Sequence, residues 1–214
     1  MAKGKQKLVD YNDAQFKVEP ADCLTFSYTS GTTGPPKGAM ISHKNMASFC
    51  AAVCFNKDTG FCQTDVALSY LPLPHILERE FMASLIYAGA TIVFYSGDVA
   101  KLKDDLALVK PTIFLSVPRL FSRFYDVLTA KFKEVQGYTK SALDYAVKTK
   151  LYNVTTSGQF THRIYDPIFF NKTKQALGGK CRLMISGSAP LLPDVQNFLK
   201  ICMCCPLLEG YGQT

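Results

Sequence analysis

Short apolar runs alternate with helical patterns along most of this chain, and that alternation constrains the fold more than any other feature of the sequence. Runs typical of buried strands lie at residues 66–71, 91–94, 112–117 and 182–185. Patterns typical of helices lie at residues 78–87, 99–109, 119–135, 141–151, 168–177 and 193–203. Strands that alternate with helices imply βαβ units. The sequence therefore predicts an α/β fold with a mostly parallel sheet and flanking helices.

The two ends of the chain follow other patterns. Residues 23–28 are typical of a strand, residues 29–38 of a loop rich in glycine, threonine and proline, and residues 39–41 of a second strand. Ser42 is a suitable N-cap for a helix that runs to Cys54. Further along, we expect a connection over residues 153–167 and the start of a last strand at Leu207–Leu208.

Composition favours a globular protein. Of 214 residues, 48% are apolar and 19% are charged, which is enough apolar surface for a sizeable core. The net charge of +7 is concentrated between Lys101 and Arg182, where 15 basic residues stand against 6 acidic ones. Such a segment could contact phosphates, a membrane surface or RNA, although a solvated basic face is the simpler interpretation.

The eight cysteines show no recognisable metal or disulfide framework. No histidine stands at ligand spacing from Cys202, Cys204 and Cys205, so zinc is not expected. No secretory leader precedes the cysteines, and we expect reduced residues that pack in a reducing compartment. The longest apolar stretches, such as residues 83–95, are shorter than the roughly 20 residues of a membrane span, so no transmembrane helix is expected.

The sharpest chemical signal is the segment Tyr28–Gly38, whose sequence is YTSGTTGPPKG. Four hydroxyl residues, three glycines and one lysine lie within the ten residues that follow Tyr28. Glycines let backbone N–H groups approach a ligand closely, hydroxyls donate further hydrogen bonds, and Lys37 adds a mobile positive charge. This combination suits a polyphosphate better than it suits an ordinary surface turn.

A P-loop nucleotide hydrolase is the obvious alternative for such a segment. Its pattern requires a Gly-Lys pair followed by serine or threonine. Here Pro36 precedes Lys37 and Gly38 follows it, so the P-loop pattern fails.

The segment resembles instead the phosphate-loop signature of the AMP-forming adenylating enzymes, which include acyl-CoA synthetases, luciferase-like enzymes and peptide-synthetase adenylation domains. LPLPHILER at residues 71–79 is similar to the long-chain acyl-CoA synthetase form of the next family motif. SGSAPL at 186–191 and EGYGQT at 209–214 are similar to the adenine-binding segments. The resemblance implies a basic N-terminal segment at 1–21. It also implies part of the family's large N-terminal domain at 22–214, truncated at both ends.

The resemblance implies a role for each matching residue. The β- and γ-phosphates of ATP would be held by Thr29, Ser30, Gly31, Thr32, Thr33, Gly34 and Lys37. His75 would lie beside the acyl carboxylate and the α-phosphate, Tyr211 would stack on adenine, and Thr214 would reach the α-phosphate. Lys37, His75 and Thr214 are thus the expected catalytic residues. The rest of the adenine pocket would come from Ser188, Ala189, Pro190, Gly210 and Gly212.

Other titratable residues receive plainer interpretations. His75 and Glu78 stand at helical i, i+3 spacing, which could suggest a metal pair, but no third ligand is evident. We therefore expect no metal site here and interpret Glu78 as an ion-paired or capping residue. His43 is interpreted as a helix-start residue and His162 as a loop residue.

The implied reaction is ATP-dependent activation of a long-chain fatty acid to acyl-AMP and then to acyl-CoA, with ATP, Mg²⁺ and CoA. Chain length is inferred only from the form of the motif at residues 71–79. A medium-chain or aryl acid ligase, or a catalytically inactive nucleotide-binding fragment, remain alternatives. The family's Mg²⁺-binding glutamate usually follows the position of Thr214, and its ribose-binding aspartate and C-terminal lysine are also missing from this chain. We therefore expect the chain alone to be inactive.

Expected partners are fatty acid, ATP and CoA, together with a possible membrane surface, and no nucleic acid. The expected location is the cytosolic face of an internal membrane such as the endoplasmic reticulum, or the cytoplasm.

Overall fold

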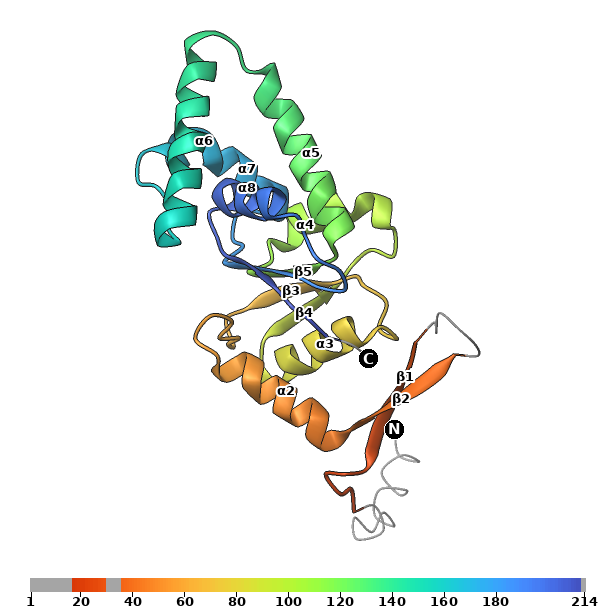
Figure 1. Cartoon of the computed structure of the whole chain (residues 1–214). Coiled ribbons are helices and arrows are strands. Elements are labelled where there is room, and N and C mark those ends of the chain that lie inside the picture. Colours follow the sequence, from red (N-terminus) through yellow and green to blue (C-terminus); the bar gives the residue numbers. More distant parts are fainter. Residues whose placement is uncertain (1–16, 30–35, 213–214) are drawn as a thin grey trace. The chain divides into compact units, whose positions relative to one another are not determined.

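A computed structural model describes residues 17–29 and 36–212 of the chain (Figure 1). These residues fall into two compact units that divide between Phe49 and Cys50. The first is built on an antiparallel hairpin of β1 (Cys23–Thr29) and β2 (Lys37–Ser42). Ser42 Oγ accepts a hydrogen bond from the backbone N–H of Asn45 at 3.2 Å, which confirms the predicted N-cap of α2 (His43–Phe55).

Five parallel strands form the sheet of the second unit, in the order β4-β3-β5-β6-β7 (Figure 1). This confirms the predicted α/β class, and each predicted strand is present. The strands are β3 (Val66–Ser69), β4 (Thr91–Phe94), β5 (Ile113–Ser116), β6 (Leu183–Ser186) and β7 (Leu207–Glu209).

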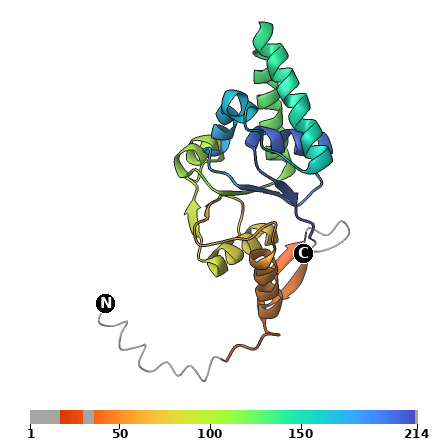
Figure 2. The same ribbon diagram turned by 90° about the vertical axis from the view of Figure 1, so that its left-hand side faces the viewer.

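Helices cover both faces of this sheet, as Figure 2 shows from the side. One face packs on α3 (Ile76–Ala88) through a cluster that includes Phe81, Leu85, Ile113 and Leu183. The opposite face carries a larger cluster with Phe114, Met184, Leu106, Phe121 and Leu199. Its helices are η2 (Val99–Lys101), α4 (Leu102–Val109), α5 (Pro118–Glu134), α6 (Gly137–Ser157) and α8 (Pro193–Met203).

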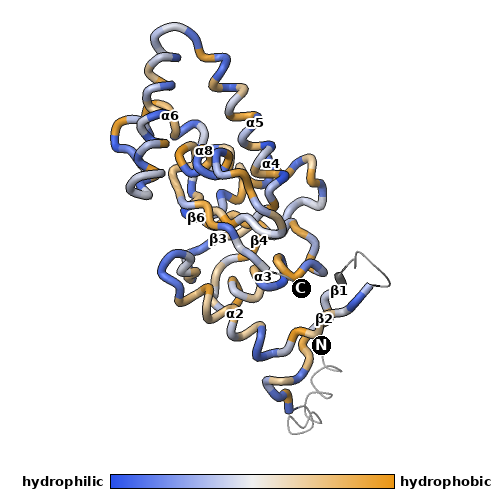
Figure 3. The backbone as a smooth tube through the Cα atoms, viewed as in Figure 1, coloured by the Kyte–Doolittle hydropathy of each residue, from blue (hydrophilic) through white to orange (hydrophobic). Residues whose placement is uncertain are grey.

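Neighbouring strand residues divide between these two clusters because successive side chains of a strand point to opposite faces. Both faces are covered, so most strand residues are apolar, and the polar residues stand at the strand ends: Ser69, Thr91, Ser116, Ser186 and Glu209. Figure 3 shows the hydropathy along the chain.

The region between α5 and β6 differs from the sequence prediction. Helix α6 is longer than the predicted 141–151 and includes the start of the predicted connection, because it ends only at Gly158, which adopts φ 70°. The predicted helix 168–177 is divided into three short helical pieces. The first of them is a π-helical turn with Pro167 near its start. The pieces are η3 (Asp166–Phe170), α7 (Asn171–Lys174) and η4 (Gln175–Leu177).

All eight cysteines are free thiols. Cys181, Cys202, Cys204 and Cys205 are buried among the helices, as predicted, whereas Cys23 and Cys62 are exposed and are not packing residues. Of the helices in the described part of the chain, none is both long and apolar enough to cross a bilayer.

An ion pair closes the amino-terminal edge of the sheet. The guanidinium of Arg182, which precedes β6, donates to Asp65 Oδ1 at 2.7 Å through Nε and to Oδ2 at 2.6 Å through Nη2. Thr112, which precedes β5, donates its hydroxyl to Asp65 Oδ1 at 2.8 Å. The backbone N–H of Cys62 donates to Oδ2 at 2.9 Å. One carboxylate thus joins the starts of β3, β5 and β6.

Burial by itself would raise the pKa of Asp65, but the hydrogen bonds from Arg182, Cys62 and Thr112 outweigh it and hold the pKa below its ordinary value. Stability from a carboxylate with a depressed pKa is present above its unfolded pKa and is lost as the pH falls through the folded pKa. The clamp therefore stabilises the fold fully above about pH 4 and weakens below it.

Arg182→Ala is expected to lower the free energy of unfolding by about 2 kcal/mol near neutral pH. This is less than a fully buried pair would lose, because the Arg182 side chain is 40% exposed and partly screened. The loss should shrink as the pH falls below about 4. Urea unfolding of the chain at several pH values measures it.

The control is Lys140→Ala, which removes an exposed i, i+4 pair with Asp144. It should cost about 0.5 kcal/mol or less. Equal losses for the two variants would mean that the Asp65 clamp is an ordinary surface pair.

Candidate functional site

The strand order reverses direction between β3 and β5. The chain passes from β3 outward to β4 on one side, and from β5 through β6 to β7 on the other. In open parallel sheets, ligands bind outside the carboxyl ends of the strands at such a switch point. The topology therefore points to the segments that follow Ser69 and Ser116, independently of any motif.

A hydrogen bond links these two strand ends. Tyr70, the residue after β3, donates its hydroxyl to Ser116 Oγ at 2.7 Å, and Ser116 is fully buried. Burial, more than this hydrogen bond, sets the pKa of Tyr70, which lies above its ordinary value. The pair fixes the start of the loop that leads to His75.

His75 is the N-cap of α3. Its Nδ1 accepts a hydrogen bond from the backbone N–H of Leu77 at 3.3 Å, and its backbone is extended. In a neutral imidazole, an accepting Nδ1 leaves the proton on Nε2. The cap therefore presents an exposed ring with an N–H donor at the carboxyl edge of the sheet. An N–H donor of this kind can bind a carboxylate or phosphate oxygen.

Glu78 holds this first turn of α3 to the sheet. It is 1% exposed and accepts a hydrogen bond from Ser69 Oγ at 2.5 Å. Burial raises the pKa of Glu78 despite that bond. Within residues 17–29 and 36–212 no ion pair involves Glu78, so the expected ion pair is replaced by a buried link to the end of β3.

At Gly187 the predicted segment 186–191 passes against the predicted segment 71–79. A Cβ at Gly187 would lie 2.8 Å from Leu77 Cδ1, so the chain after β6 passes close beside the start of α3, and a larger residue there would require the Leu77 side chain to move. Its backbone N–H donates to the carbonyl of Ser116 at 3.2 Å. The next residue, Ser188, has φ 76°, a left-handed conformation that is uncommon outside glycine.

The predicted segment 209–214 is hydrogen-bonded to the segment 186–191 through two backbone N–H groups. The backbone N–H of Gly210 donates to the carbonyl of Ser186 at 2.8 Å, and that of Leu191 donates to Glu209 Oε1 at 2.7 Å. Ser188, Ala189 and Pro190 are exposed in the turn between these contacts, as are Gly210 and Gly212 beyond it. The ring of Tyr211 is 91% exposed.

The phosphate-loop segment belongs to the other unit. Thr29 ends β1 and Lys37 opens β2, and the two residues are cross-strand partners. Lys37 and Gly38 thus lie in a strand rather than in the predicted loop. Five further predicted site residues lie outside the described residues, as does Thr214 near the end of the chain. These five are Ser30, Gly31, Thr32, Thr33 and Gly34.

The structure brings together the segments of His75, Ser188 and Tyr211 at one edge of the sheet. Sequence reasoning missed Tyr70 and Ser116, although each is a polar residue at the end of an apolar run. No three acidic, cysteine or histidine side chains of the described ranges lie close enough together to bind a metal ion.

The family model of the AMP-binding enzymes matches residues 2–214. The chain belongs to this family. The predicted segments at 71–79, 186–191 and 209–214 come after or at the ends of β3, β6 and β7, so they meet at one edge of the sheet.

Curated relatives of this chain include long-chain acyl-CoA synthetases. Long chain acyl-CoA synthetase 7, peroxisomal, of Arabidopsis thaliana is 43% identical over 196 residues, which are 92% of this chain and 28% of the relative. Long-chain-fatty-acid–CoA ligase 1 of Homo sapiens is 39% identical over 200 residues, 91% of this chain and 28% of the relative. The chain thus spans well under a third of the length of these two relatives.

Solved structures of adenylation domains share the fold. The adenylation domain of a carboxylate reductase from Mycobacterium chelonae matches 92% of this chain and 27% of its own, with a TM-score of 0.68 and 25% identity. ATP-bound MatB from Rhodopseudomonas palustris matches 91% of this chain and 30% of its own, with a TM-score of 0.58 and 26% identity.

Two substitutions separate the capping role of His75 from ligand binding. His75→Ala removes the cap and should destabilise the first turn of α3 by about 1 kcal/mol. His75→Asn keeps a capping oxygen and should restore that turn, but it lacks the imidazole N–H. We expect AMP to bind about tenfold more weakly to both variants, because each loses one hydrogen bond to a charged group.

Hydrogen exchange of the α3 amides and calorimetric titration of AMP into the full-length protein measure the two effects. If His75→Asn binds AMP as tightly as the unchanged protein, the ring acts only as a cap.

Proposed function

We propose that the protein containing this chain is an AMP-forming long-chain fatty acid–CoA ligase. The observation that carries the proposal is identity of 39–43% to long-chain acyl-CoA synthetases and ligases over more than nine-tenths of this chain. The motif with His75 at the switch point of the sheet supports it.

The proposed reaction has two steps. A fatty acid carboxylate oxygen attacks the α-phosphorus of ATP, forming acyl-AMP and releasing pyrophosphate. The sulfur of CoA then attacks the acyl carbon, and AMP leaves. Two anions meet in the first step and charge builds on the departing pyrophosphate, so hydrogen-bond donors and positive charges placed around the phosphates lower its barrier.

The predicted site residues keep their proposed roles. Thr29, Ser30, Gly31, Thr32, Thr33 and Gly34 would hold the terminal phosphates, with Lys37 as the charge donor. His75 would donate Nε2–H to the acyl carboxylate or α-phosphate oxygen. Exposure of the Tyr211 ring leaves it available to stack on adenine. Thr214 would contact the α-phosphate.

Mg²⁺ is proposed only as a companion of the nucleotide, since the described residues offer it no group of ligands. We also propose residues 22–214 as the adenylation portion, preceded by a basic segment at 1–21.

The proposed location is the cytosolic face of an internal membrane, or the cytoplasm. Two Arabidopsis relatives carry the word peroxisomal in their names, which makes the peroxisome one candidate membrane.

Lys37→Ala in the full-length enzyme is expected to slow adenylate formation by about 10²-fold or more, the scale of losing one preorganised donor. Fatty-acid-dependent exchange of labelled pyrophosphate into ATP measures this step. Lys44→Ala, which changes a lysine outside the motif, serves as the matched control. An exchange rate equal to that of the control would remove Lys37 from the mechanism.

Apolar acyl chains should be preferred, because each buried methylene contributes about 0.8 kcal/mol. We expect kcat/KM to rise from acetate through octanoate to palmitate and to be low for benzoate. A maximum at acetate or benzoate would assign the protein to another acid–CoA ligase of the superfamily. No product with any acid would favour the alternative of a nucleotide-binding protein without turnover.

A further inference from the structure

Helix α6 has one face in the core and an aromatic face in solvent. Leu143, Ala146 and Lys150 are buried on its inner side. Three tyrosines lie on its outer side, and their exposed fractions are 97% for Tyr138, 64% for Tyr145 and 68% for Tyr152.

The three tyrosines form a stripe because they are spaced seven residues apart. Two helical turns take 7.2 residues, so side chains at this spacing lie nearly one above another. At 1.5 Å of rise per residue, the stripe from Tyr138 to Tyr152 is about 21 Å long. Tyrosine has an apolar ring and a hydroxyl that can remain in water, so a stripe of this kind suits a boundary between apolar and aqueous phases.

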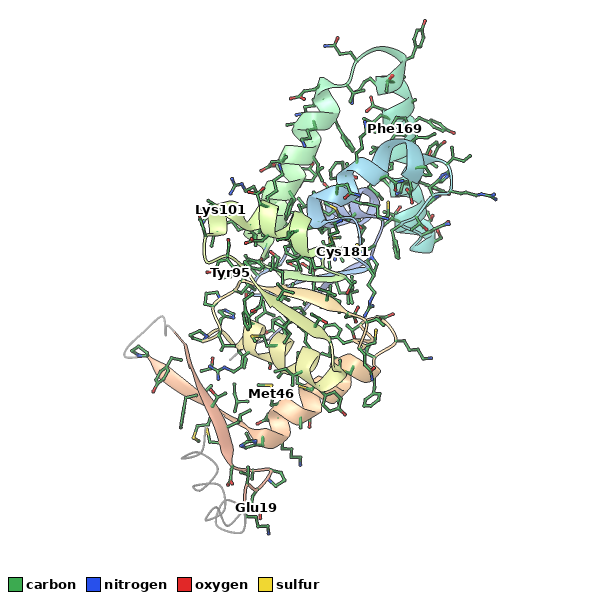
Figure 4. All side chains as sticks on the ribbon, turned by 180° about the vertical axis from the view of Figure 1, so that it is seen from behind. Glu19, Met46, Tyr95, Lys101, Phe169 and Cys181 are labelled. Carbon is green, nitrogen blue, oxygen red and sulfur yellow. The ribbon has the colours of Figure 1, made fainter. Side chains whose placement is uncertain are left out.

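Exposed aliphatic side chains extend this surface. The ring of Tyr145 packs edge-on against that of Tyr165, with centroids 6.4 Å apart. Ile164 and Ile168 flank Tyr165 in sequence, and each is 59% exposed. Phe169, labelled in Figure 4, marks this segment, which lies on the same side of the sheet as α5 and α6. We call Tyr138, Tyr145, Tyr152, Ile164 and Ile168 together the Tyr–Ile surface.

The chain segment that carries this surface, residues 137–174, has an excess of positive charge. Residues 137–174 contain only two acidic residues, Asp144 and Asp166, and both are ion-paired, with Lys140 and Lys150 respectively. Three further cations are exposed and make no ion pair with any described residue. They are Lys148, Arg163 and Lys172.

We propose that the Tyr–Ile surface binds an anionic lipid bilayer at the headgroup level. Tyrosine is enriched at membrane–water interfaces, exposed isoleucine gains from contact with acyl chains, and juxtamembrane basic residues are attracted to anionic headgroups. A nucleic acid would also attract the cations, but it offers nothing to the two isoleucines. The protein would thus bind the bilayer peripherally through this surface, with α6 lying along the membrane–water interface.

This surface is separate from the carboxyl edge of the sheet and does not depend on the proposed reaction. If the proposed function holds, the surface would place the enzyme where membrane-dissolved fatty acid is available. Vesicle binding and turnover of a water-soluble acid are measured independently, so failure of one is distinguishable from failure of the other.

The test is sedimentation of the full-length protein with vesicles of phosphatidylcholine, with and without phosphatidylserine. The combined variant Y138S/Y145S/Y152S should bind anionic vesicles at least about tenfold more weakly, since three interfacial side chains are lost. Lys148→Glu should weaken binding to anionic vesicles by about 25-fold and leave binding to neutral vesicles unchanged, because attraction per cation is about fivefold and the charge changes by two. Leu108→Ser, at a residue of α4 that is 82% exposed, is the matched control and should bind normally.

Unchanged acyl-CoA formation from octanoate is expected for all variants, and unchanged thermal unfolding midpoints are expected for Lys148→Glu and Leu108→Ser. The triple variant also loses the contact between the rings of Tyr145 and Tyr165, so a small decrease of its midpoint is expected. Two results would overturn the proposal: equal vesicle binding by the triple variant and the control, or preferential binding of RNA over vesicles by the unchanged protein.

Discussion

The carboxylate of Asp65 is the constraint on which the parallel sheet depends. It accepts from Arg182, Thr112 and Cys62, and so it fixes where three strands begin relative to one another. Because the strands are only three or four residues long, their starts determine where they end. A shift of one residue in any strand would also turn its apolar side chains to the wrong face. The alignment of the segments at the carboxyl edge therefore begins at the opposite edge of the sheet.

The two edges of the sheet satisfy their polar groups in different ways. The amino edge uses a buried carboxylate and a guanidinium, which form a charge-assisted pair. The carboxyl edge uses hydrogen bonds donated by hydroxyl groups, from Tyr70 to Ser116 and from Ser69 to Glu78. These links bind the first residues of each loop and leave the rest exposed. At the amino edge the polar side chains are thus bonded to one another and stabilise the sheet. At the carboxyl edge the loop residues beyond these hydrogen bonds remain exposed to solvent.

Periodicity in the sequence predicted every strand of the parallel sheet and most helices, because each element buries a continuous or regularly spaced apolar pattern. The prediction from periodicity was wrong about helix boundaries that are determined by a local capping residue. Helix α6 continues to Gly158 through threonines and an asparagine that carry no apolar period, and α3 begins early because His75 supplies a capping nitrogen. The motif residues of the site were predicted from resemblance, whereas Tyr70 and Ser116 become visible only once two distant strand ends are neighbours. A single sequence carries no signal for that pairing.

Lys150 shows why charge counts from sequence describe a surface poorly. It belongs to the basic segment, yet its side chain is completely buried. Its ammonium pairs with Asp166, donates to the carbonyl of Ile201 at 2.8 Å and lies 4.2 Å from the centre of the Phe170 ring. An ammonium held by these partners permits only one rotation of α6 about its axis, since any other would leave the charge buried without them. That rotation turns the opposite side of the helix outward. The buried cation on one face therefore determines that the tyrosines on the other lie in solvent.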